Sequence, residues 1–251
     1  VSAKEVAKGL NIEKFGFLGT AFGAALMQLT KLSHFNKVYE DRKHLSGTQF
    51  IDSILNYLEV DFEIPEKDLK RIPKTGPFIA ISNHPLGAID GMILMKILIE
   101  KRPDFKIIAN FLLHRLDPLQ PYIMPVNPFE DRKEAKSSVK GLKESILHLR
   151  NGNPLGIFPA GEVSTHKEDK IIVDRPWLPE AMKLIQKSEV PVVPIYFHAK
   201  NSAAFYRLAK LNDSFRTAKL PSEMLTQKKR KIKVRIGNPI SVADQQEHET
   251  L

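Results

Sequence analysis

Beyond residue 70, short apolar runs alternate with longer amphipathic segments, and this pattern predicts strands that are followed by helices. The apolar runs have the length of strands and occupy residues 77–82, 105–110, 122–126, 154–159, 190–197 and 231–237. Between them, apolar positions recur at helical spacing over residues 89–101, 133–152, 179–188 and 203–211. The alternation favours an α/β fold with a mostly parallel central sheet flanked by helices. Pro191 and Pro194 lie in the fifth run and predict an edge strand or a shaped pocket wall there.

The chain before this pattern reads as a helical region. A proline-rich connection at residues 64–77 follows it, so we expect an N-terminal helical region over 1–65 and an α/β domain over 66–251. The apolar stretch 15–27 has 13 residues and is shorter than the roughly 20 that a membrane-spanning helix needs. Its apolar positions continue at three- and four-residue spacing to residue 29, which predicts an amphipathic helix. That helix either packs on the protein's own core or lies in a membrane interface.

The composition of the chain excludes some kinds of chemistry and favours some kinds of partner. The chain has 251 residues, no cysteine and a formal net charge of +9, so disulfides and thiolate catalysis are excluded and an anionic partner is favoured. The basic run KKRKIKVR (228–235) reads as a solvated strand, and no aromatic platform for nucleobases accompanies it, so we expect no nucleic-acid partner. No short ligand motif joins the histidines and carboxylates, so we expect no metal and no bound cofactor.

The first strand leads into NHPLGAIDG, a segment that predicts a strand-to-helix corner. His84 lies at the positive end of the coming helix dipole, which favours a neutral imidazole that can accept a proton, and Gly87 allows a close backbone approach. Asp90 can orient that imidazole, but six positions along a regular helix leave the two side chains about 120° apart around the helix axis. The two side chains can therefore meet only if His84 lies outside the regular helix. The structural alternative is a helix N-terminus that His84 caps, with Asp90 in solvent.

Two further strand ends carry polar groups. Arg132 and Lys133 follow the third strand at the entry to a helix, where an anionic group can bind, although the residues alone favour ordinary surface charge. After the fourth strand, Gly161 permits a tight turn and is followed by Glu162 and Ser164. The segment is neither a G-x-S-x-G elbow nor a P-loop.

Four segments in this order, NHPLGAID, VNPFEDR, FPAGEVS and VPVVPIYF, resemble the signature blocks of the glycerolipid (lysophospholipid, PlsC-like) acyltransferase superfamily. VRIGNPI (234–240) is similar to the strand that often closes its domain. The resemblance covers residues 70–242. This sequence departs from the usual blocks in two places: five residues separate His84 from Asp90, and an alanine and a glutamate replace usual residues of the third block. Both departures resemble a bacterial branch of the superfamily that carries the hemolysin name. That branch includes O-acyltransferases that make ornithine and glycine lipids from lyso-aminolipids with a 3-hydroxy fatty acyl chain.

The resemblance implies roles for particular residues. His84 would be the general base that deprotonates an acceptor hydroxyl, and Asp90 would orient it and support the imidazolium. Backbone N–H groups near Gly87 would stabilise the oxyanion, and Asn83 would belong to the substrate-binding corner. Arg132 would hold the anionic part of the acceptor or donor. Glu162 and Ser164 beside Gly161 would shape the acceptor pocket, where Glu162 would suit a lipid amine.

The same resemblance implies the partners. The acyl donor would be acyl-ACP or acyl-CoA, and the acceptor would be a lyso-lipid. The protein would lie at the cytoplasmic face of the inner membrane, as a peripheral or monotopic protein. A membrane role for residues 1–35 is then favoured over packing on the core. The alternatives are a non-catalytic lipid-binding protein on the same fold, a 1-acylglycerol-3-phosphate acyltransferase, and thioester hydrolysis with water in place of the acceptor.

Overall fold

The computed structural model describes most of the chain. The described residues are 21, 24, 27–28, 31–110, 113–126, 136–166, 171–211 and 213–247. The predicted helix that begins at Phe15 falls almost entirely outside them. No helix among the described residues is long and apolar enough to cross a bilayer.

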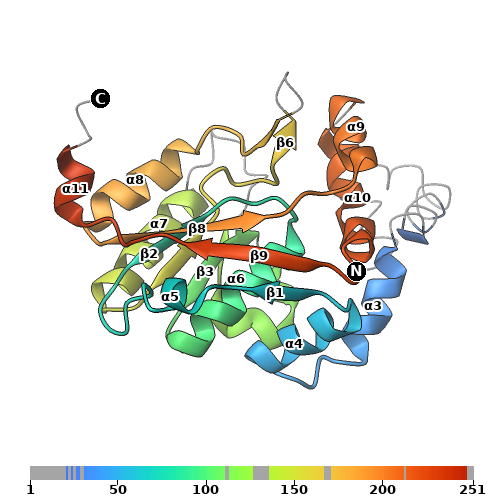
Figure 1. Cartoon of the computed structure of the whole chain (residues 1–251), viewed down its shortest axis with the longest axis horizontal. Coiled ribbons are helices and arrows are strands. Elements are labelled where there is room, and N and C mark those ends of the chain that lie inside the picture. The colour runs from blue at the N-terminus through green and yellow to red at the C-terminus, as the bar shows by residue number, and fades with distance from the viewer. Residues whose placement is uncertain are drawn as a thin grey trace.

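The centre of the molecule is a seven-stranded sheet, which contains the six strands predicted from the apolar runs and one further strand (Figure 1). Its strands in spatial order are β1 (Asp61–Glu63), β9 (Lys231–Ile236), β8 (Val192–His198), β2 (Ile79–Ser82), β5 (Leu155–Ile157), β3 (Lys106–Asn110) and β4 (Ile123–Val126). The five strands from β8 to β4 are parallel, while β9 runs antiparallel to β8 and parallel to β1. The expectation of a mostly parallel α/β sheet is therefore confirmed. A short antiparallel hairpin pairs β6 (Thr165–His166) with β7 (Ile172–Val173).

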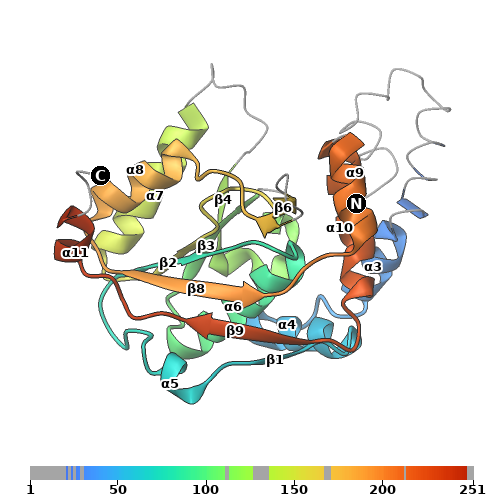
Figure 2. The same cartoon turned by 45° about the horizontal axis from the view of Figure 1, so that its top comes forward.

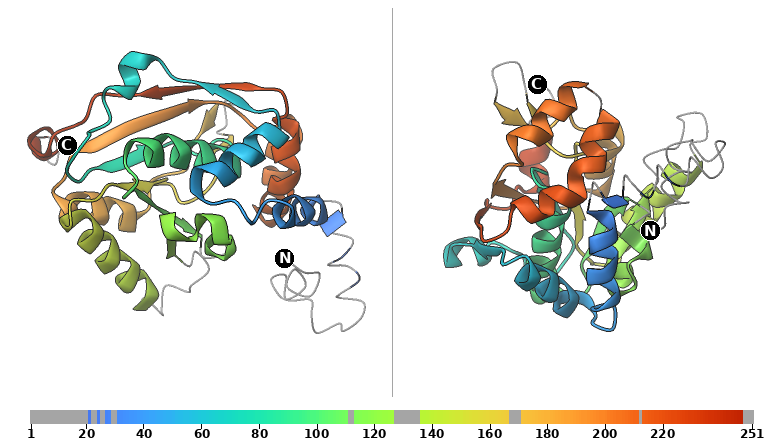
Figure 3. Two further views of the ribbon diagram at one scale, coloured as in Figure 1. Left: turned by 90° about the horizontal axis from the view of Figure 1, so that it is seen from below. Right: turned by 90° about the vertical axis from the view of Figure 1, so that its right-hand side faces the viewer.

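Helices cover both faces of the sheet, because successive side chains of each central strand point to opposite faces. In β2, Ala80 packs in the cluster that contains α4 (Gly47–Tyr57) and α6 (Ala88–Lys101), whereas Ile79 packs in the cluster that contains α7 (Lys136–Arg150) and α8 (Pro179–Ser188). Figure 3, left, shows α4 and α6 on one side of the sheet. The remaining elements are α3 (Leu32–Glu40), α5 (Glu66–Leu69), α9 (Ala203–Leu211), α10 (Asp213–Thr226), α11 (Val242–Glu247) and the 3-10 turns Leu113–Arg115 and Asp117–Tyr122.

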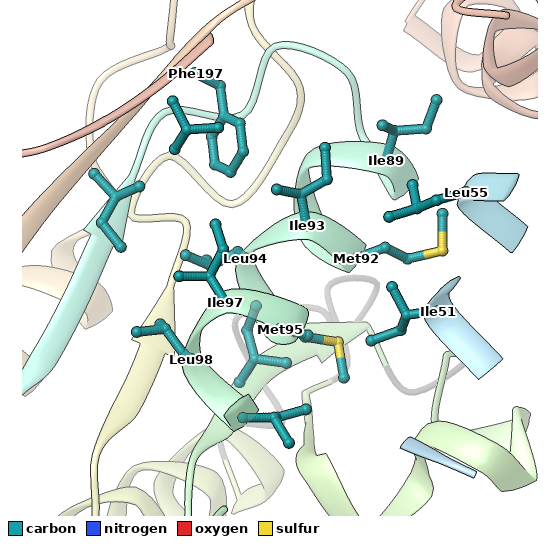
Figure 4. Packing of buried hydrophobic residues seen from close by; sticks show 14 of the residues in the cluster. Ile51, Leu55, Ile89, Met92, Ile93, Leu94, Met95, Ile97, Leu98 and Phe197 are labelled. Carbon is teal, nitrogen blue, oxygen red and sulfur yellow. The ribbon is translucent and has the colours of Figure 1, made fainter. Parts of the chain in front are cut away.

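Helix α6 is apolar around most of its circumference, and such a helix is stable only when it is buried on several sides. Here it lies between the sheet and α4 (Figure 4). Its side chains Ile89, Met92 and Met95 are buried near Ile51 and Leu55 of α4. Because this core fixes the position of α6, it also fixes the start of the helix at the end of β2.

The described N-terminal residues belong to the same core. Helix α4 packs against α6, and β1 adds to the sheet beside β9. The boundary expected near residue 65 therefore marks a change in sequence pattern, while described residues on both sides share one hydrophobic cluster.

The edge strand expected from Pro191 and Pro194 is wrong, because β8 lies between β9 and β2. Pro194 pairs with Ile81 on the parallel side. On the other side its carbonyl accepts a hydrogen bond of 2.8 Å from the Gly237 N–H, just after β9 ends. A Cβ on Gly237 would lie 2.7 Å from the proline Cγ, so the glycine leaves room for the ring. A central strand tolerates this proline because its neighbour has no side chain.

Helices α9 and α10 stand at the end of the sheet toward which β8 points (Figure 2). Ser202 precedes α9, and its Oγ accepts a hydrogen bond from the Phe205 N–H. Glu223 of α10 is fully buried and accepts hydrogen bonds from the N–H and the hydroxyl of Ser202, each 2.8 Å long. The two helices are thereby fixed to the segment that follows β8.

Candidate active site

Three loops meet at the carboxyl end of β2, where the strand lies between β5 and β8. The loop after β2 is 83–87, the loop after β5 is 158–164, and the loop after β8 is 199–202. The Ser164 N–H donates to the His84 carbonyl, which joins the first two loops. Ligands of open α/β sheets bind outside the carboxyl ends of the strands, so this is the expected place for a site.

His84 and Asp90 lie together at this corner. Nδ1 of His84 is 3.0 Å from Oδ1 of Asp90, whose side chain is 0% exposed, while 18% of the His84 side chain remains exposed. His84 lies before α6 begins, which is the arrangement that the six-residue spacing requires. The ring is turned so that Nδ1 forms no well-aligned hydrogen bond within the described residues. Catalytic hydrogen bonds in ligand-free enzymes are often loose in this way and tighten with substrate.

Backbone donors hold the Asp90 carboxylate in place. Oδ2 accepts a 2.7 Å hydrogen bond from the Leu86 N–H, and Oδ1 accepts one of 2.8 Å from the Gly91 N–H. An acid in the first turn that reaches back to the preceding N–H is a common way to cap a helix. Gly87 makes the turn with φ of 82°, and its position for a Cβ is only 3.1 Å from a methyl of Leu220 on α10. The corner is therefore closed both by its own backbone and by α10.

The His84 ring and backbone have further partners that the sequence patterns did not identify. Phe158 stacks on the imidazole with 3.9 Å between ring centroids. Asp174, directly after β7, accepts a hydrogen bond from the His84 N–H at 3.3 Å and a short one from the Ser164 hydroxyl. Ser164 thus supports the corner through Asp174, and its contact with an acceptor stays a prediction.

The neighbours of His84 are bound to the end of β8. The Asn83 amide donates to the Phe197 carbonyl at 3.0 Å and accepts from the Phe197 N–H at 2.8 Å. Asn201 donates from Nδ2 to the Pro85 carbonyl at 3.0 Å. Both polar ends of the Asn83 amide are used by the backbone, which indicates a role in placing His84. Its predicted contact with substrate stays untested.

The loop after β5 combines a tight turn with an ion cluster. Gly161 has φ of 70°, a backbone conformation that favours glycine, and a Cβ there would lie 2.5 Å from a methyl of the exposed Leu178 side chain. Glu162 forms ion pairs with two arginines, Arg175 at 3.3 Å and the buried Arg216 of α10. The Glu162 carboxylate is therefore already paired with two guanidinium groups, and its contact with a lipid amine stays a prediction.

The remaining predictions about site residues cannot be placed. Arg132 and Lys133 lie outside the described residues. Within the described ranges, no three histidine, aspartate or glutamate side chains gather as a metal site requires.

The residues that sequence reasoning missed contact the site from far along the chain. Asp174 is 90 positions from His84, Asn201 is 116 from Pro85, and Arg216 is 54 from Glu162. No spacing rule connects such pairs. For Asp174, a polar residue at the end of a two-residue strand, the hairpin itself would have had to be recognised first.

A family model described as Acyltransferase matches residues 21–251 of the chain. A lyso-glycine lipid O-acyltransferase of Phocaeicola vulgatus is 27% identical over 247 residues, which cover 96% of this chain and 86% of that protein. The enzyme of the same name from Bacteroides thetaiotaomicron is 28% identical over 223 residues, which cover 86% of this chain and 79% of that protein.

Among solved structures, the 1-acyl-sn-glycerophosphate (LPA) acyltransferase PlsC from Thermotoga maritima aligns with a TM-score of 0.47 and 16% identity. The alignment covers 95% of this chain and 84% of that one.

Proposed function

Because the chain belongs to the acyltransferase family, we propose that it moves a fatty acyl group from a thioester donor to the hydroxyl of a lyso-lipid. The observation that carries the proposal is the His84 imidazole, partly exposed at the end of β2, with Nδ1 3.0 Å from the buried Asp90 carboxylate. A base that is oriented by a carboxylate on one nitrogen presents its other nitrogen to a substrate proton. That arrangement suits deprotonation of an alcohol as it attacks a carbonyl.

In the proposed reaction, Nε2 of His84 removes the proton of the acceptor hydroxyl while its oxygen attacks the thioester carbonyl. A carbon–oxygen bond forms, the carbon–sulfur bond then breaks, and the proton passes from the imidazolium to the departing thiolate. In this proposal, backbone N–H groups near Gly87, at the start of α6, stabilise the tetrahedral oxyanion between these steps. The Gly91 N–H is not among them, because it donates to Asp90. Asp90 stabilises the imidazolium, and no covalent acyl-enzyme is needed.

For the acceptor, we favour a lyso-aminolipid. Two relatives that each cover more than four fifths of this chain carry the name lyso-glycine lipid O-acyltransferase. The third signature block reads Phe-Pro-Ala-Gly-Glu, without the arginine that glycerol-phosphate enzymes place there. The acyl donor in this proposal is acyl-ACP or acyl-CoA, and no other cofactor takes part.

The proposal places the enzyme at the cytoplasmic face of the inner membrane, peripheral or monotopic. Its acceptor is a membrane lipid, and a net charge of +9 favours an anionic lipid surface. The amphipathic pattern of residues 15–29 would provide the apolar contact with that surface.

The first test is release of free thiol from acyl-ACP and acyl-CoA, measured with and without a lyso-aminolipid and with lysophosphatidic acid. We expect release that depends on the lyso-aminolipid, and a loss of roughly 10²- to 10⁴-fold in rate for His84→Ala, the range for a positioned general base. Near wild-type turnover in His84→Ala would contradict the mechanism.

The alternatives give different results in the same assay. Release without any acceptor indicates thioester hydrolysis, and release with lysophosphatidic acid alone indicates a glycerol-phosphate acceptor. Stoichiometric lipid binding without any release indicates a non-catalytic lipid-binding protein.

A further inference from the structure

Helices leave one face of the sheet open at β8 and β9 (Figure 2). Side chains that lie directly opposite each other on neighbouring antiparallel strands point to the same face. In this register Tyr196 is opposite Arg235 and His198 is opposite Lys233, and all four side chains are exposed. On the same side of β8, Val192 belongs to the hydrophobic cluster of α7 and α8, so their cover ends within this strand. The later part of β8 and its partner β9 therefore present an open surface.

Most of the basic run KKRKIKVR lies at the end of the sheet that holds the candidate active site. Because β9 runs antiparallel to β8, the start of β9 is beside the carboxyl end of β8. The exposed cations at this end are here called the basic face: Lys200, Lys228, Lys229, Arg230, Lys231 and Lys233. Lys200, Arg230 and Lys231 line one hollow of about 290 Å³. Within the described residues, the carboxylates beside the basic face are fewer, namely Glu59, Asp61 and Glu63.

The ion pairs of the basic face leave its lysines accessible to a partner. Lys229 lies 3.8 Å from the Glu59 carboxylate, and Lys233 lies 3.9 Å from that of Glu63. The two lysine side chains are 75% and 71% exposed. Exposed ion pairs of this kind are weak, because water solvates both charges. An incoming anionic surface can therefore share these ammonium groups at little cost.

The basic face borders the His84 corner. The Asn83 side chain is hydrogen-bonded to both the N–H and the carbonyl of Phe197, the residue before His198. His198 in turn pairs with Lys233 of β9. Neighbouring strands lie about 4.8 Å apart, so Lys233 is only two strands away from the corner. A partner that docks on the basic face is therefore next to the candidate active site.

We propose that the basic face is the docking surface for an acidic acyl carrier protein (ACP), which brings the acyl thioester to His84. This inference rests on the proposed function, in which the donor is acyl-ACP or acyl-CoA. Oppositely charged surfaces attract each other before contact and set the orientation in which two proteins meet. Docking beside the corner brings the thioester arm of the carrier to the end of the sheet where His84 lies.

The spacing of the cations favours a protein over the nucleotide of acyl-CoA. Side chains on one face of a strand are about 7 Å apart, so Lys231 and Lys233 present separate charges along β9. Carboxylates on the surface of a protein are spread in a similar way, whereas the phosphates of one nucleotide are close together and need converging donors.

The composition of the open surface favours a protein over an anionic bilayer. Strands β8 and β9 are described throughout, and neither exposes an aliphatic side chain on this face. Such side chains would be needed to insert among lipids. Tyr196, which is 51% exposed and packs edge-on against His198, is the exposed aromatic residue here. Tyrosine is enriched in protein–protein interfaces.

The test reverses two charges of the basic face in the double variant Lys231→Glu/Lys233→Glu. With acyl-ACP as donor we expect kcat/KM to fall about 10-fold or more through KM, with kcat retained at saturation, because the charges act on the encounter. Any rate with acyl-CoA should stay at the wild-type value, since acyl-CoA has the same thioester arm and no protein. Thermal unfolding should show that the variant is folded.

The matched control is Lys70→Glu/Lys74→Glu, which changes the net charge by the same amount. Both lysines are exposed, and Lys70 is paired with Glu66 much as Lys231 is paired with Glu63. They lie by α5, at the opposite end of β9, and the control should keep the wild-type KM for acyl-ACP. An unchanged KM in the test variant, an equal rise in the control, or an equal loss with acyl-CoA would overturn the proposal.

Binding of holo-ACP, which carries no acyl group, separates failure of this inference from failure of the proposed function. The wild type should bind holo-ACP, and binding should weaken as salt rises and in Lys231→Glu/Lys233→Glu. Such binding without acyl transfer from any donor would refute the proposed function and leave the docking surface standing. No binding of holo-ACP by the wild type would refute the docking surface. A variant that loses anionic vesicles and keeps holo-ACP would refute it as well and assign the basic face to the membrane.

Discussion

At the scale of single residues, the His84 corner is fixed from several directions. Asn83 and Pro85 are each hydrogen-bonded to the segment around the end of β8, and Asp174 holds the N–H of His84 itself. The backbone on both sides of the His84 side chain is therefore held in place by the surrounding structure. Asp90 differs from these partners because it is the carboxylate close to the imidazole, so changing it should affect chemistry as well as stability.

We expect Asp90→Asn to lower kcat by about 10²-fold or more, because an amide cannot stabilise the imidazolium as a carboxylate does. Steady-state rates and thermal unfolding should be measured together. Glu100→Gln is the control, since Glu100 is an exposed acid at the other end of α6, paired with Lys96. A kcat for Asp90→Asn within a few-fold of the control would remove Asp90 from the mechanism.

The sequence predicted that His84 and Asp90 can meet at one corner, but it did not predict the residues around them, for a physical reason. His84 and Asp90 belong to one strand-to-helix corner, so local geometry relates them. Asp174 contacts His84 from the hairpin, and Arg216 of α10 contacts Glu162 in the loop after β5. Such tertiary packing leaves no periodic signal in the chain.

At the scale of elements, strands and helices with a clear apolar pattern were predicted nearly to the residue. The run 231–237 is β9, and 203–211 coincides with α9. The missed elements lack that pattern. Strand β1 is the charged tripeptide Asp-Phe-Glu, β6 and β7 have two residues each, and α10 contains Pro221. These elements are stabilised by tertiary packing, which the secondary-structure propensities of their residues do not reveal.

The short helix α5 shows how a small element can hold the sheet. Its Asp68 is fully buried and accepts hydrogen bonds from Arg71 at 2.9 Å, from Arg235 at 2.7 Å and from the Ile236 N–H at 3.2 Å. The pKa of Asp68 lies below its ordinary value, chiefly because of the Arg235 hydrogen bond, with a further contribution from Ile236. Helix α5 is thereby fixed to the end of β9.

Asp68→Asn should lower the free energy of unfolding by about 2–4 kcal/mol, because buried donors lose a charged acceptor. The matched change is Glu66→Gln on the same helix, whose pair with Lys70 is exposed and should contribute less than about 1 kcal/mol. Urea unfolding of both variants gives the comparison. Similar midpoints for the two variants would show that Asp68 does not hold α5 to β9.

The lowered pKa of Asp68 also sets a pH dependence. A carboxyl with a depressed pKa stabilises the fold fully above its unfolded value of about 4 and loses that contribution as the pH falls further. Unfolding measured from pH 6 to 3 should therefore show a smaller acid-induced loss of stability in Asp68→Asn than in the wild type. An identical pH profile would contradict the assignment.

At the scale of the whole molecule, charge and apolar pattern both favour a lipid surface. We expect vesicles that contain anionic lipid to bind the protein more tightly than neutral vesicles, and binding to weaken as salt rises, since screening acts over about 10 Å at 0.1 M. Removal of residues 1–20, which leaves every described residue in place, should reduce binding to both kinds of vesicle. Flotation assays measure this, and unchanged binding would assign the membrane contact to another part of the chain.

The place of β9 in the sheet also bears on how the protein folds as it is synthesised. Strand β1 pairs with β9 alone, in a register that joins Phe62 to Ile232. The ribosome must therefore add some 170 residues after β1 before that strand can find its neighbour. Until then, the edge of β8 that β9 will cover is open, and pairing across so long a loop is slow. We therefore expect the nascent chain to depend on chaperones until β9 has been synthesised, long after helix α4 has formed.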